Sequence, residues 1–354
     1  MASVQFLERV GRWSELTRVA YGVSLGVFAK SFGVSQPDEI VAKIKAGELD
    51  VYDAFDKFTG ILVARALAPK TIHMYVAAVK SYLRHEGVEV DNYQLRMRAG
   101  VPPNMETSLD RIPTHEELRR ILLACNTRAR ALIALLASSG LRIGEAGNLR
   151  VGNLDLLGNK VTVVAARSKS RRTRVTFITD ETARFLREYL GQRINSKDEW
   201  LFPRPGTQEH LTRNSLYGFI QLPLMKLGLR QKLDPSSFMH ELHPHSFRKY
   251  FFTKLIGAGV DRGVAEYLMG HKFGLDNAYL RMDEERLRKE YMKAADDFVF
   301  LTDRKLDRES KERVDQLQEQ LKKKDMELIA TNERLARLEG KFETAFEKKI
   351  TNAT

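Results

Sequence analysis

The residues best able to do chemistry in this sequence are arginines and histidines that stand three positions from a partner. Arg142 precedes Glu145 by three positions, so on one helical turn the carboxylate could hold the guanidinium in place. His245 precedes Arg248 by the same spacing, and the helix start predicted there favours a bound anion. Either pair alone is also typical of a structural ion pair. Together they indicate a site for a negatively charged group such as a phosphate.

A lysine and a tyrosine would complete such a site with a proton donor and a nucleophile. Lys169 lies in the segment 167–174, which contains five cations and no acidic residue, and its ammonium could protonate a leaving oxygen. Tyr279 follows His271 by eight positions, and a tyrosine hydroxyl can attack phosphorus to form a covalent intermediate. Tyr291 lies further along, in a stretch with a helical pattern, and remains an alternative nucleophile.

This set of side chains suits phosphoryl transfer without a metal ion. Two guanidiniums can each bind a pentacoordinate phosphate through paired hydrogen bonds and neutralise its charge. A covalent phosphotyrosine conserves the energy of the phosphodiester, so a strand can be rejoined without ATP. His240, His243 and His245 lack the helical spacing and the accompanying Cys or carboxylate ligands of a zinc site. We therefore expect no metal and no cofactor.

In the order of these residues the chain resembles the tyrosine recombinase (phage integrase) family over about residues 5–300. The matching residues, at successive spacings of 27, 76, 3, 23 and 8 positions, are Arg142, Lys169, His245, Arg248, His271 and Tyr279. The resemblance also implies that Glu145 orients Arg142, and that His271 hydrogen-bonds to the phosphate.

The resemblance assigns a role to each of the other matching residues. Arg142 and Arg248 would clamp the scissile phosphate, and Lys169 would protonate the leaving 5′-oxygen. His245 would act as general base or acid toward the tyrosine. Tyr279 would be the nucleophile that forms a 3′-phosphotyrosyl link.

The implied function is that of a site-specific DNA recombinase or integrase, similar to the integrases of archaeal mobile elements. It would cleave and rejoin double-stranded DNA attachment sites through a covalent 3′-phosphotyrosine, and a homotetramer would join two sites. One alternative is a type IB topoisomerase-like enzyme that relaxes DNA, and another is a non-catalytic architectural protein that binds DNA. A scaffold whose main function is a coiled coil is a third alternative, which the distribution of charge disfavours.

The elements that must position these residues are mostly helical. Hydrophobic periodicity predicts a mainly α fold with a small antiparallel β-sheet in the catalytic domain. We expect a helical core-binding (DNA-binding) domain at 1–97 and a proline-containing linker at 98–113. A mixed α/β catalytic domain would follow at 114–302, and a C-terminal coiled-coil helix at 303–354.

Local patterns indicate how the catalytic domain carries its candidate residues. Residues 114–117 have the sequence of a capping box, which predicts a helix start. Residues 129–139 are apolar almost throughout, which predicts a buried helix directly before Arg142. Residues 160–165 and 174–178 alternate as strands do, so the cationic segment would form the loop between them.

Basic side chains on two elements are the expected DNA contacts. An amphipathic helix at 67–84 would present Lys70, Lys80 and Arg84 on its polar side. The cationic loop would add Arg167, Arg171, Arg172 and Arg174. Arg167 is also an alternative to Lys169, but a guanidinium is a poor proton donor at neutral pH.

The charge of the chain agrees with a polyanionic partner. Lys and Arg exceed Asp and Glu by 58 to 46, and nine of the twelve net positive charges lie in residues 106–302. The single cysteine, Cys125, excludes a disulfide scaffold. No segment reaches the roughly 18 apolar residues of a membrane span, and the N-terminus is too polar for a signal peptide. We expect a cytoplasmic, nucleoid-associated protein without membrane contact.

The C-terminal segment carries a heptad pattern. Apolar residues recur every seven positions at Val314, Leu321, Leu328, Leu335 and Phe342. A second seam contains Leu317, Leu338 and Ala345, and is interrupted by Lys324 and Thr331. The pattern predicts a coiled coil of about five heptads, through which the chain would associate with itself or with another protein. The alternative is a single solvated helix.

Overall fold

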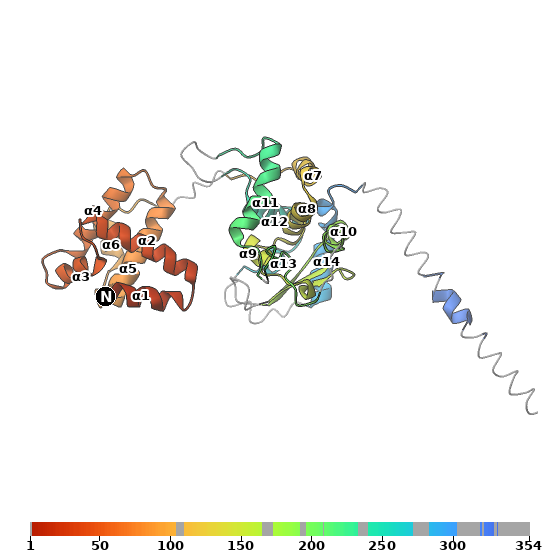
Figure 1. The fold of residues 1–354 in the computed structure, drawn as a ribbon, viewed down its shortest axis with the longest axis horizontal. Coiled ribbons are helices and arrows are strands. Elements are labelled where there is room, and N and C mark those ends of the chain that lie inside the picture. Colours follow the sequence, from red (N-terminus) through yellow and green to blue (C-terminus); the bar gives the residue numbers. More distant parts are fainter. Residues whose placement is uncertain are drawn as a thin grey trace, which may run out of the picture. The chain divides into compact units, whose positions relative to one another are not determined.

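The computed structural model divides the chain into two compact units, Met1–Ser108 and Leu109–Thr354 (Figure 1). The described residues are 2–103, 110–164, 173–191, 196–207, 209–232, 240–271, 283–302, 319–320, 322–328 and 331. Within these ranges the chain is mostly helical, with one small antiparallel sheet in the second unit. The fold class predicted from the sequence is therefore confirmed.

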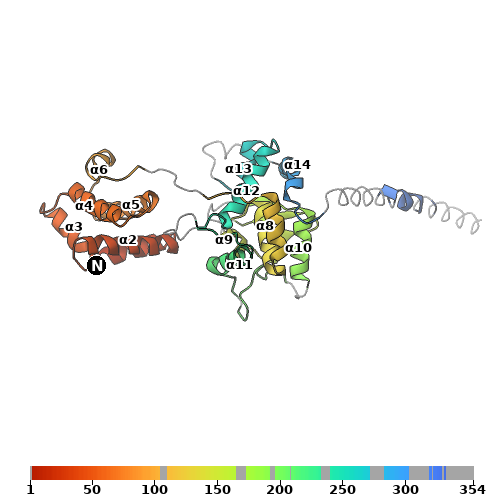
Figure 2. The same cartoon turned by 90° about the horizontal axis from the view of Figure 1, so that it is seen from above.

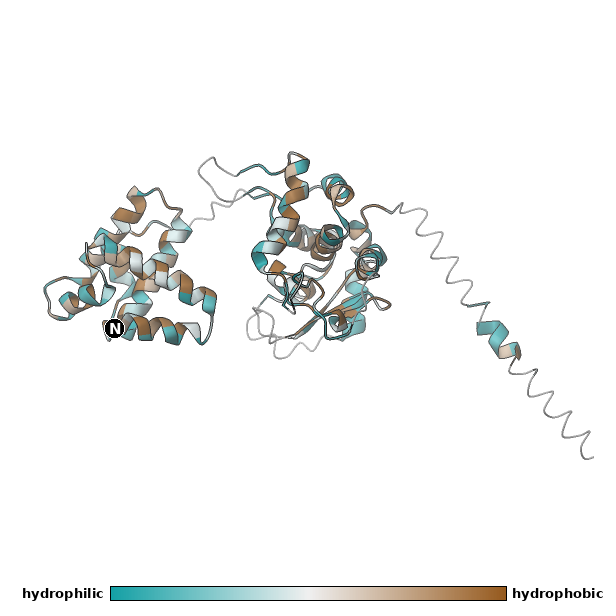
Figure 3. Ribbon diagram, in the orientation of Figure 1, coloured by the Kyte–Doolittle hydropathy of each residue, from teal (hydrophilic) through white to brown (hydrophobic). Residues whose placement is uncertain are grey.

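The first unit is built from helices that turn their apolar faces toward a common core. They are α1 (Ala2–Gly11), α2 (Glu15–Ser31), α3 (Pro37–Lys45), α4 (Val51–Ala64), α5 (Pro69–His85) and α6 (Asn92–Arg98). The predicted apolar face of α5 is buried, since Ile72, Val76, Val79 and Leu83 are at most 5% exposed. Figure 3 shows the matching alternation of hydrophilic and hydrophobic residues along these helices.

The second unit contains the candidate chemical residues. Its helices are α7 (His115–Ala124), α8 (Thr127–Ser139), α9 (Ile143–Gly147), α10 (Asp180–Leu190), α11 (Arg213–Lys226), α12 (Pro244–Gly257), α13 (Arg262–Met269) and α14 (Glu284–Met292). The predicted capping box opens α7: Glu117 N donates to Thr114 Oγ1 at 3.1 Å, and Thr114 N donates to Glu117 Oε2 at 2.8 Å. Both terminal N–H groups are thereby satisfied.

The sheet of this unit consists of short antiparallel strands. They are β1 (Leu154–Asp155), β2 (Lys160–Val163) and β3 (Arg174–Phe177), in that spatial order. The register of β2 and β3 runs from Lys160 opposite Phe177 to Val163 opposite Arg174. This pairing confirms the predicted strands on either side of the cationic segment. Residues 165–172 themselves lie outside the described residues.

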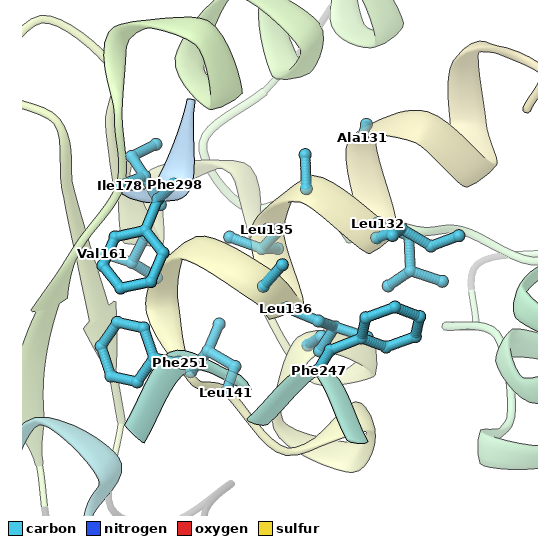
Figure 4. Packing of buried hydrophobic residues seen from close by; sticks show 14 of the residues in the cluster. Ala131, Leu132, Leu135, Leu136, Leu141, Val161, Ile178, Phe247, Phe251 and Phe298 are labelled. Carbon is cyan, nitrogen blue, oxygen red and sulfur yellow. The ribbon is translucent and has the colours of Figure 1, made fainter. Parts of the chain in front are cut away.

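Helix α8 forms the centre of the second unit. Apart from Arg130, all its residues from Ala129 to Ser139 are buried, as its apolar sequence predicts. It packs against α10 and α12 (Figure 2). Figure 4 shows Leu132, Leu135 and Leu136 of α8 among the rings of Phe247 and Phe251 from α12. Because α8 is buried on all sides, the residues that follow its C-terminus, including Arg142, start from a well-defined position.

Stacked aromatic rings close the core beside the end of α8. The centroid of Phe298 lies 5.2 Å from that of Phe251 and 5.7 Å from that of Tyr291. Tyr291 is only 1% exposed, and its hydroxyl donates to the carbonyl of Ser138 at 3.0 Å. These contacts connect α14 to α8.

The described part of the tail is short and helical. Residues 319–320, 322–328 and 331 are in helical conformation, and Leu328 is 63% exposed. The other apolar residues of the predicted heptads lie outside the described residues. Across the described ranges, no helix combines the length and the apolar character needed to cross a membrane.

We expect Gly140→Ala to destabilise the second unit, because α8 ends at Gly140 in the left-handed conformation with φ 64°. A Cβ at this position would lie 2.3 Å from the ring of Phe251. The backbone strain and the overpacking together should lower the free energy of unfolding by about 2–4 kcal/mol, measured by urea denaturation.

Gly218→Ala is the matched control for this substitution. Gly218 lies inside α11, is exposed, and a Cβ there would meet nothing within 4 Å. The change should leave stability unchanged or raise it by up to about 1 kcal/mol. Equal effects of the two substitutions would contradict a special role for the turn at Gly140.

Candidate active site

The candidate site is organised around the carboxylate of Glu145. Arg142 is the N-cap of α9, and its Nη1 donates to Glu145 Oε1 at 3.0 Å. The backbone N–H of Arg142 donates to Glu145 Oε2, also at 3.0 Å. The predicted contact between Arg142 and Glu145 is thus present. The side chain of Arg142 stays 30% exposed, whereas that of Glu145 is 2% exposed.

A second arginine binds the same carboxylate. Arg174 Nη2 donates to Glu145 Oε2 at 2.7 Å, and Arg174 Nη1 donates to Glu145 Oε1 at 3.2 Å. Burial alone would raise the pKa of Glu145, but the hydrogen bond and the charge of Arg174 outweigh it and lower that pKa below its usual value. Glu145 is therefore ionised at neutral pH.

The prediction that Arg174 contacts DNA from the loop surface is wrong. Arg174 is 4% exposed, and its Nε donates to the carbonyl of Leu268 at 3.1 Å, in addition to the bonds with Glu145. In the structure Arg174, Thr176 and Phe177 are buried and Val175 is half-buried, because α8 and α13 pack against this strand.

Arg248 is almost completely buried. It is 1% exposed and belongs to α12, directly behind the ends of two other helices. Its Nη2 donates to the carbonyl of Met269 at 2.6 Å, and its Nη1 donates to the carbonyl of Gly140. Its Nε has no hydrogen-bond partner among the described residues. A buried donor without an acceptor costs about 1–3 kcal/mol, so an anion that accepted from Nε would be favoured.

The three guanidiniums are close enough to repel one another. Burial lowers the pKa of Arg248, the charge of Arg142 lowers it further, and Arg174 acts in the same direction. Glu145 is the carboxylate that Arg142 and Arg174 share. This group of three arginines and Glu145 therefore has an excess of positive charge that a tetrahedral oxyanion could neutralise.

His245 lies at the start of α12, three positions before Arg248, and is an exposed residue. Partial desolvation of the imidazole lowers the pKa of His245, and the nearby positive charge of Arg248 lowers it further. The imidazole is therefore neutral at pH 7 and can accept a proton.

A carboxylate near the start of the second unit braces the same end of α12. Asp110 Oδ1 accepts from Lys249 Nζ at 2.7 Å, and Asp110 Oδ2 lies 3.7 Å from His243 Nε2. The side chain of Asp110 is 2% exposed. No sequence pattern indicated this residue, because it lies in the stretch predicted to be a linker.

His271 follows the left-handed Gly270, which caps α13 with φ 67°. The backbone N–H of His271 donates to the carbonyl of Glu266 at 3.0 Å, and its Nδ1 pairs with the Glu266 carboxylate. Glu266 thus fixes the orientation of the ring, although sequence reasoning missed it. The five-residue separation of Glu266 and His271 is the signal that could have identified the pair once the helix end was known.

Several predicted site residues lie outside the described residues: Lys169, Tyr279, Arg167, Arg171 and Arg172. Their roles remain predictions. The alternative nucleophile, Tyr291, is described and is enclosed in the core, where burial raises its pKa well above the usual value. A tyrosine so buried, and bonded to Ser138, is poorly placed to attack DNA.

The predicted DNA contacts of the first unit lie along α5. Lys70 and Arg84 are exposed, and Lys80 is partly exposed and hydrogen-bonds to Asn92. Their side chains lie at the surface of that unit, as the amphipathic pattern predicts. Their contact with DNA remains a prediction.

The arrangement can bind a phosphodiester and assist a displacement at phosphorus. Arg142 and Arg248 provide charge-assisted donors, His245 provides a neutral imidazole, and His271 provides a second imidazole that a carboxylate holds in place. Among the described residues, no group of three or more His, Cys, Asp or Glu side chains could hold a metal ion.

Comparison with known proteins gives a match to one family. Residues 112–286 match the model of the phage integrase family. The chain is 27% identical over 253 residues to the tyrosine recombinase XerA of Thermococcus kodakarensis, a match that covers 70% of this chain and 83% of that protein. It is 24% identical over 272 residues to the tyrosine recombinase XerD of Rickettsia bellii, which covers 70% of this chain and 85% of that protein.

Two solved structures share the fold. One is the XerH site-specific recombinase bound to its difH substrate, with a TM-score of 0.55 and 20% identity over 77% of this chain and 78% of that one. The other is the Tn1549 transposon integrase in complex with transposon right end DNA. Its TM-score is 0.54 at 16% identity, and the match covers 83% of this chain and 100% of that one.

Proposed function

Because the chain belongs to the phage integrase family of tyrosine recombinases, we propose that it cleaves and rejoins DNA at specific sites through a covalent 3′-phosphotyrosine. The names of its relatives favour a recombinase over a DNA-relaxing enzyme or an architectural protein. Two of the solved structures that it resembles contain DNA, which supports a DNA partner for this chain as well.

The observation that carries the proposal is the excess of positive charge around Glu145. Three arginines approach one another there, and Arg248 is buried with an Nε that has no partner within the described ranges. Charges of like sign are gathered in a protein interior only where a negative group can balance them. A scissile phosphate, whose charge increases in the transition state, is the group that this site fits.

The proposed reaction uses the side chains of the chain itself. Tyr279 attacks phosphorus while His245, neutral at pH 7, accepts its proton. Arg142 and Arg248 stabilise the pentacoordinate phosphorus, and His271 donates a further hydrogen bond. Lys169 protonates the 5′-oxygen as it leaves. Attack of a 5′-hydroxyl on the phosphotyrosine then reverses these steps and rejoins a strand.

We further propose that the active assembly is a homotetramer on two double-stranded DNA sites, at the nucleoid. The heptads of residues 303–354 support a coiled coil that links protomers. The exposed cations of α5 supply backbone contacts on each DNA site.

Covalent trapping tests the function and the nucleophile together. Incubation with nicked duplexes of randomised sequence should yield a protein–DNA adduct that survives SDS, because a nick lets the cleaved end diffuse away. The adduct should form in EDTA, and sequencing its DNA identifies the site. Tyr279→Phe should abolish the adduct.

Tyr291→Phe is the control for that experiment. It removes one buried hydrogen bond, so it should cost about 1 kcal/mol of stability and leave the adduct intact. An adduct that persists in Tyr279→Phe but disappears in Tyr291→Phe would reverse the assignment. A strict requirement for Mg²⁺ would contradict the metal-free reaction.

The pH dependence of adduct formation reports on His245. Since the pKa of this histidine is lowered, the neutral form that accepts a proton persists below the ordinary value of about 6.5. The single-turnover rate should therefore stay constant from pH 8 to about 6.5 and fall only at lower pH. His210→Gln, a change at a half-buried ring that packs on Trp200, should leave the profile unchanged. An acidic limb centred at or above pH 6.5 would contradict this role for His245.

Deletion of residues 303–354 tests the tail. The truncated protein should still form the adduct on a single site, because the described candidate residues all lie before residue 303. Its assembly on paired sites, followed by native electrophoresis and light scattering, should be reduced. Unchanged assembly would rule out a linking role for the heptads.

A further inference from the structure

We propose that Arg174 is a positioning residue of the reaction: it shares the Glu145 carboxylate so that Arg142 keeps an unbalanced positive charge for the phosphate. The inference rests on the proposed function and concerns a residue that would not itself touch DNA. Arg174 is 4% exposed, and its side chain points away from the surface.

The first part of the argument is the geometry of the shared carboxylate. Arg174 donates through both Nη atoms to the two oxygens of Glu145, at 2.7 and 3.2 Å. Arg142 binds the same oxygens through one guanidinium nitrogen and through its backbone N–H, each at 3.0 Å. The guanidinium that binds Glu145 through two nitrogens is therefore that of Arg174, and the guanidinium of Arg142 donates through one nitrogen. Such a fork fixes the plane of the carboxylate.

The second part is electrostatic. If Arg174 were absent, Glu145 could turn its full charge and both oxygens to Arg142. That ion pair would reduce the charge available to a phosphate and would compete with it for the guanidinium. With Arg174 present, the one negative charge of Glu145 is divided between two guanidiniums. The more exposed guanidinium, that of Arg142, therefore keeps its attraction for an anion.

The third part is the connection to the other catalytic segments. Arg174 Nε donates to the carbonyl of Leu268 at 3.1 Å, and Arg248 Nη2 donates to the next carbonyl, that of Met269, at 2.6 Å. Both arginines thus bind the last turn of α13, where free carbonyls and the helix dipole favour cations. His271 follows this turn directly.

The close approach of Arg174 also explains the residue at position 270. A Cβ on Gly270 would lie 2.7 Å from the guanidinium of Arg174, and its φ of 67° is strained for other residues. Only glycine lets the guanidinium lie against the helix end. Arg174 therefore holds three parts of the site together: Glu145 with Arg142, the end of α13, and strand β3.

The test uses the full-length chain and the nicked duplex recovered from its own covalent adduct. Arg174→Met keeps an unbranched stem but removes the guanidinium and its charge. A shift of the reacting groups by about 1 Å can cost about a hundredfold in rate, so we expect a loss of that order in the single-turnover rate. The dissociation constant for DNA should hardly change, and the final adduct yield should match that of the wild type.

Two further variants separate an electrostatic role from a structural one. Arg174→Lys keeps the charge and should restore part of the rate. Glu145→Gln in the Arg174→Met background removes the carboxylate that would otherwise neutralise Arg142, so the double variant should react faster than Arg174→Met alone. Lys160→Met, which breaks a partly exposed ion pair of the same sheet with Glu284 at 3.1 Å, is the matched control and should keep the wild-type rate.

The outcomes are distinct. If wild-type protein forms no adduct, the proposed function fails and this inference fails with it. If the wild type forms the adduct and Arg174→Met reacts at the same rate, only the inference is overturned. It is also overturned if Arg174→Met gives a lower adduct yield at the wild-type rate, or if Glu145→Gln adds to the defect. Either result would indicate a purely structural residue.

Discussion

Glu145 accepts hydrogen bonds from Arg142 and Arg174 while it is almost completely buried, and the geometry of the site depends on that carboxylate. Breaking a buried ion pair by removal of one partner typically costs about 3–5 kcal/mol, because the other charge is left without compensation. Here the ion pair also connects two elements of the fold, because Arg174 begins β3 and Glu145 lies in α9. The sheet, the turn after α8 and the end of α13 are therefore fixed relative to one another by one set of hydrogen bonds.

The second constraint is that two helices end at the same buried guanidinium. α8 and α13 each finish at a left-handed glycine, Gly140 and Gly270. The carbonyls of Gly140 and Met269 accept from Arg248, so helix ends that would otherwise need water are satisfied by a cation. The same donors orient Arg248 without a carboxylate of its own, which leaves its charge for an anion. Packing of Phe251 against Gly140 shows how little space this arrangement allows.

The fold was largely predictable because it follows local rules. The apolar run at 129–139 became the buried helix α8, the alternating segments became β2 and β3, and the capping box opened α7. Periodicity and capping act within a few residues, so a single sequence carries that information. Contacts between distant residues carry no such signal. The bond between Asp110 and Lys249 spans 139 positions, and nothing in a proline-containing stretch indicated it.

The sequence by itself determined which chemical groups are present and their order along the chain: paired arginines, histidines after a helix start and after a glycine, and the contact between Arg142 and Glu145. Spacing of three residues decides such a contact because one helical turn brings the side chains together. Only the tertiary structure decided what each remaining cation does. Arg174 looked like part of a solvated basic loop, but α8 and α13 pack against β3, and Glu145 of α9 binds the guanidinium. A charge buried by elements 29 and 94 positions away must find its partners among them, and no local pattern contains that requirement.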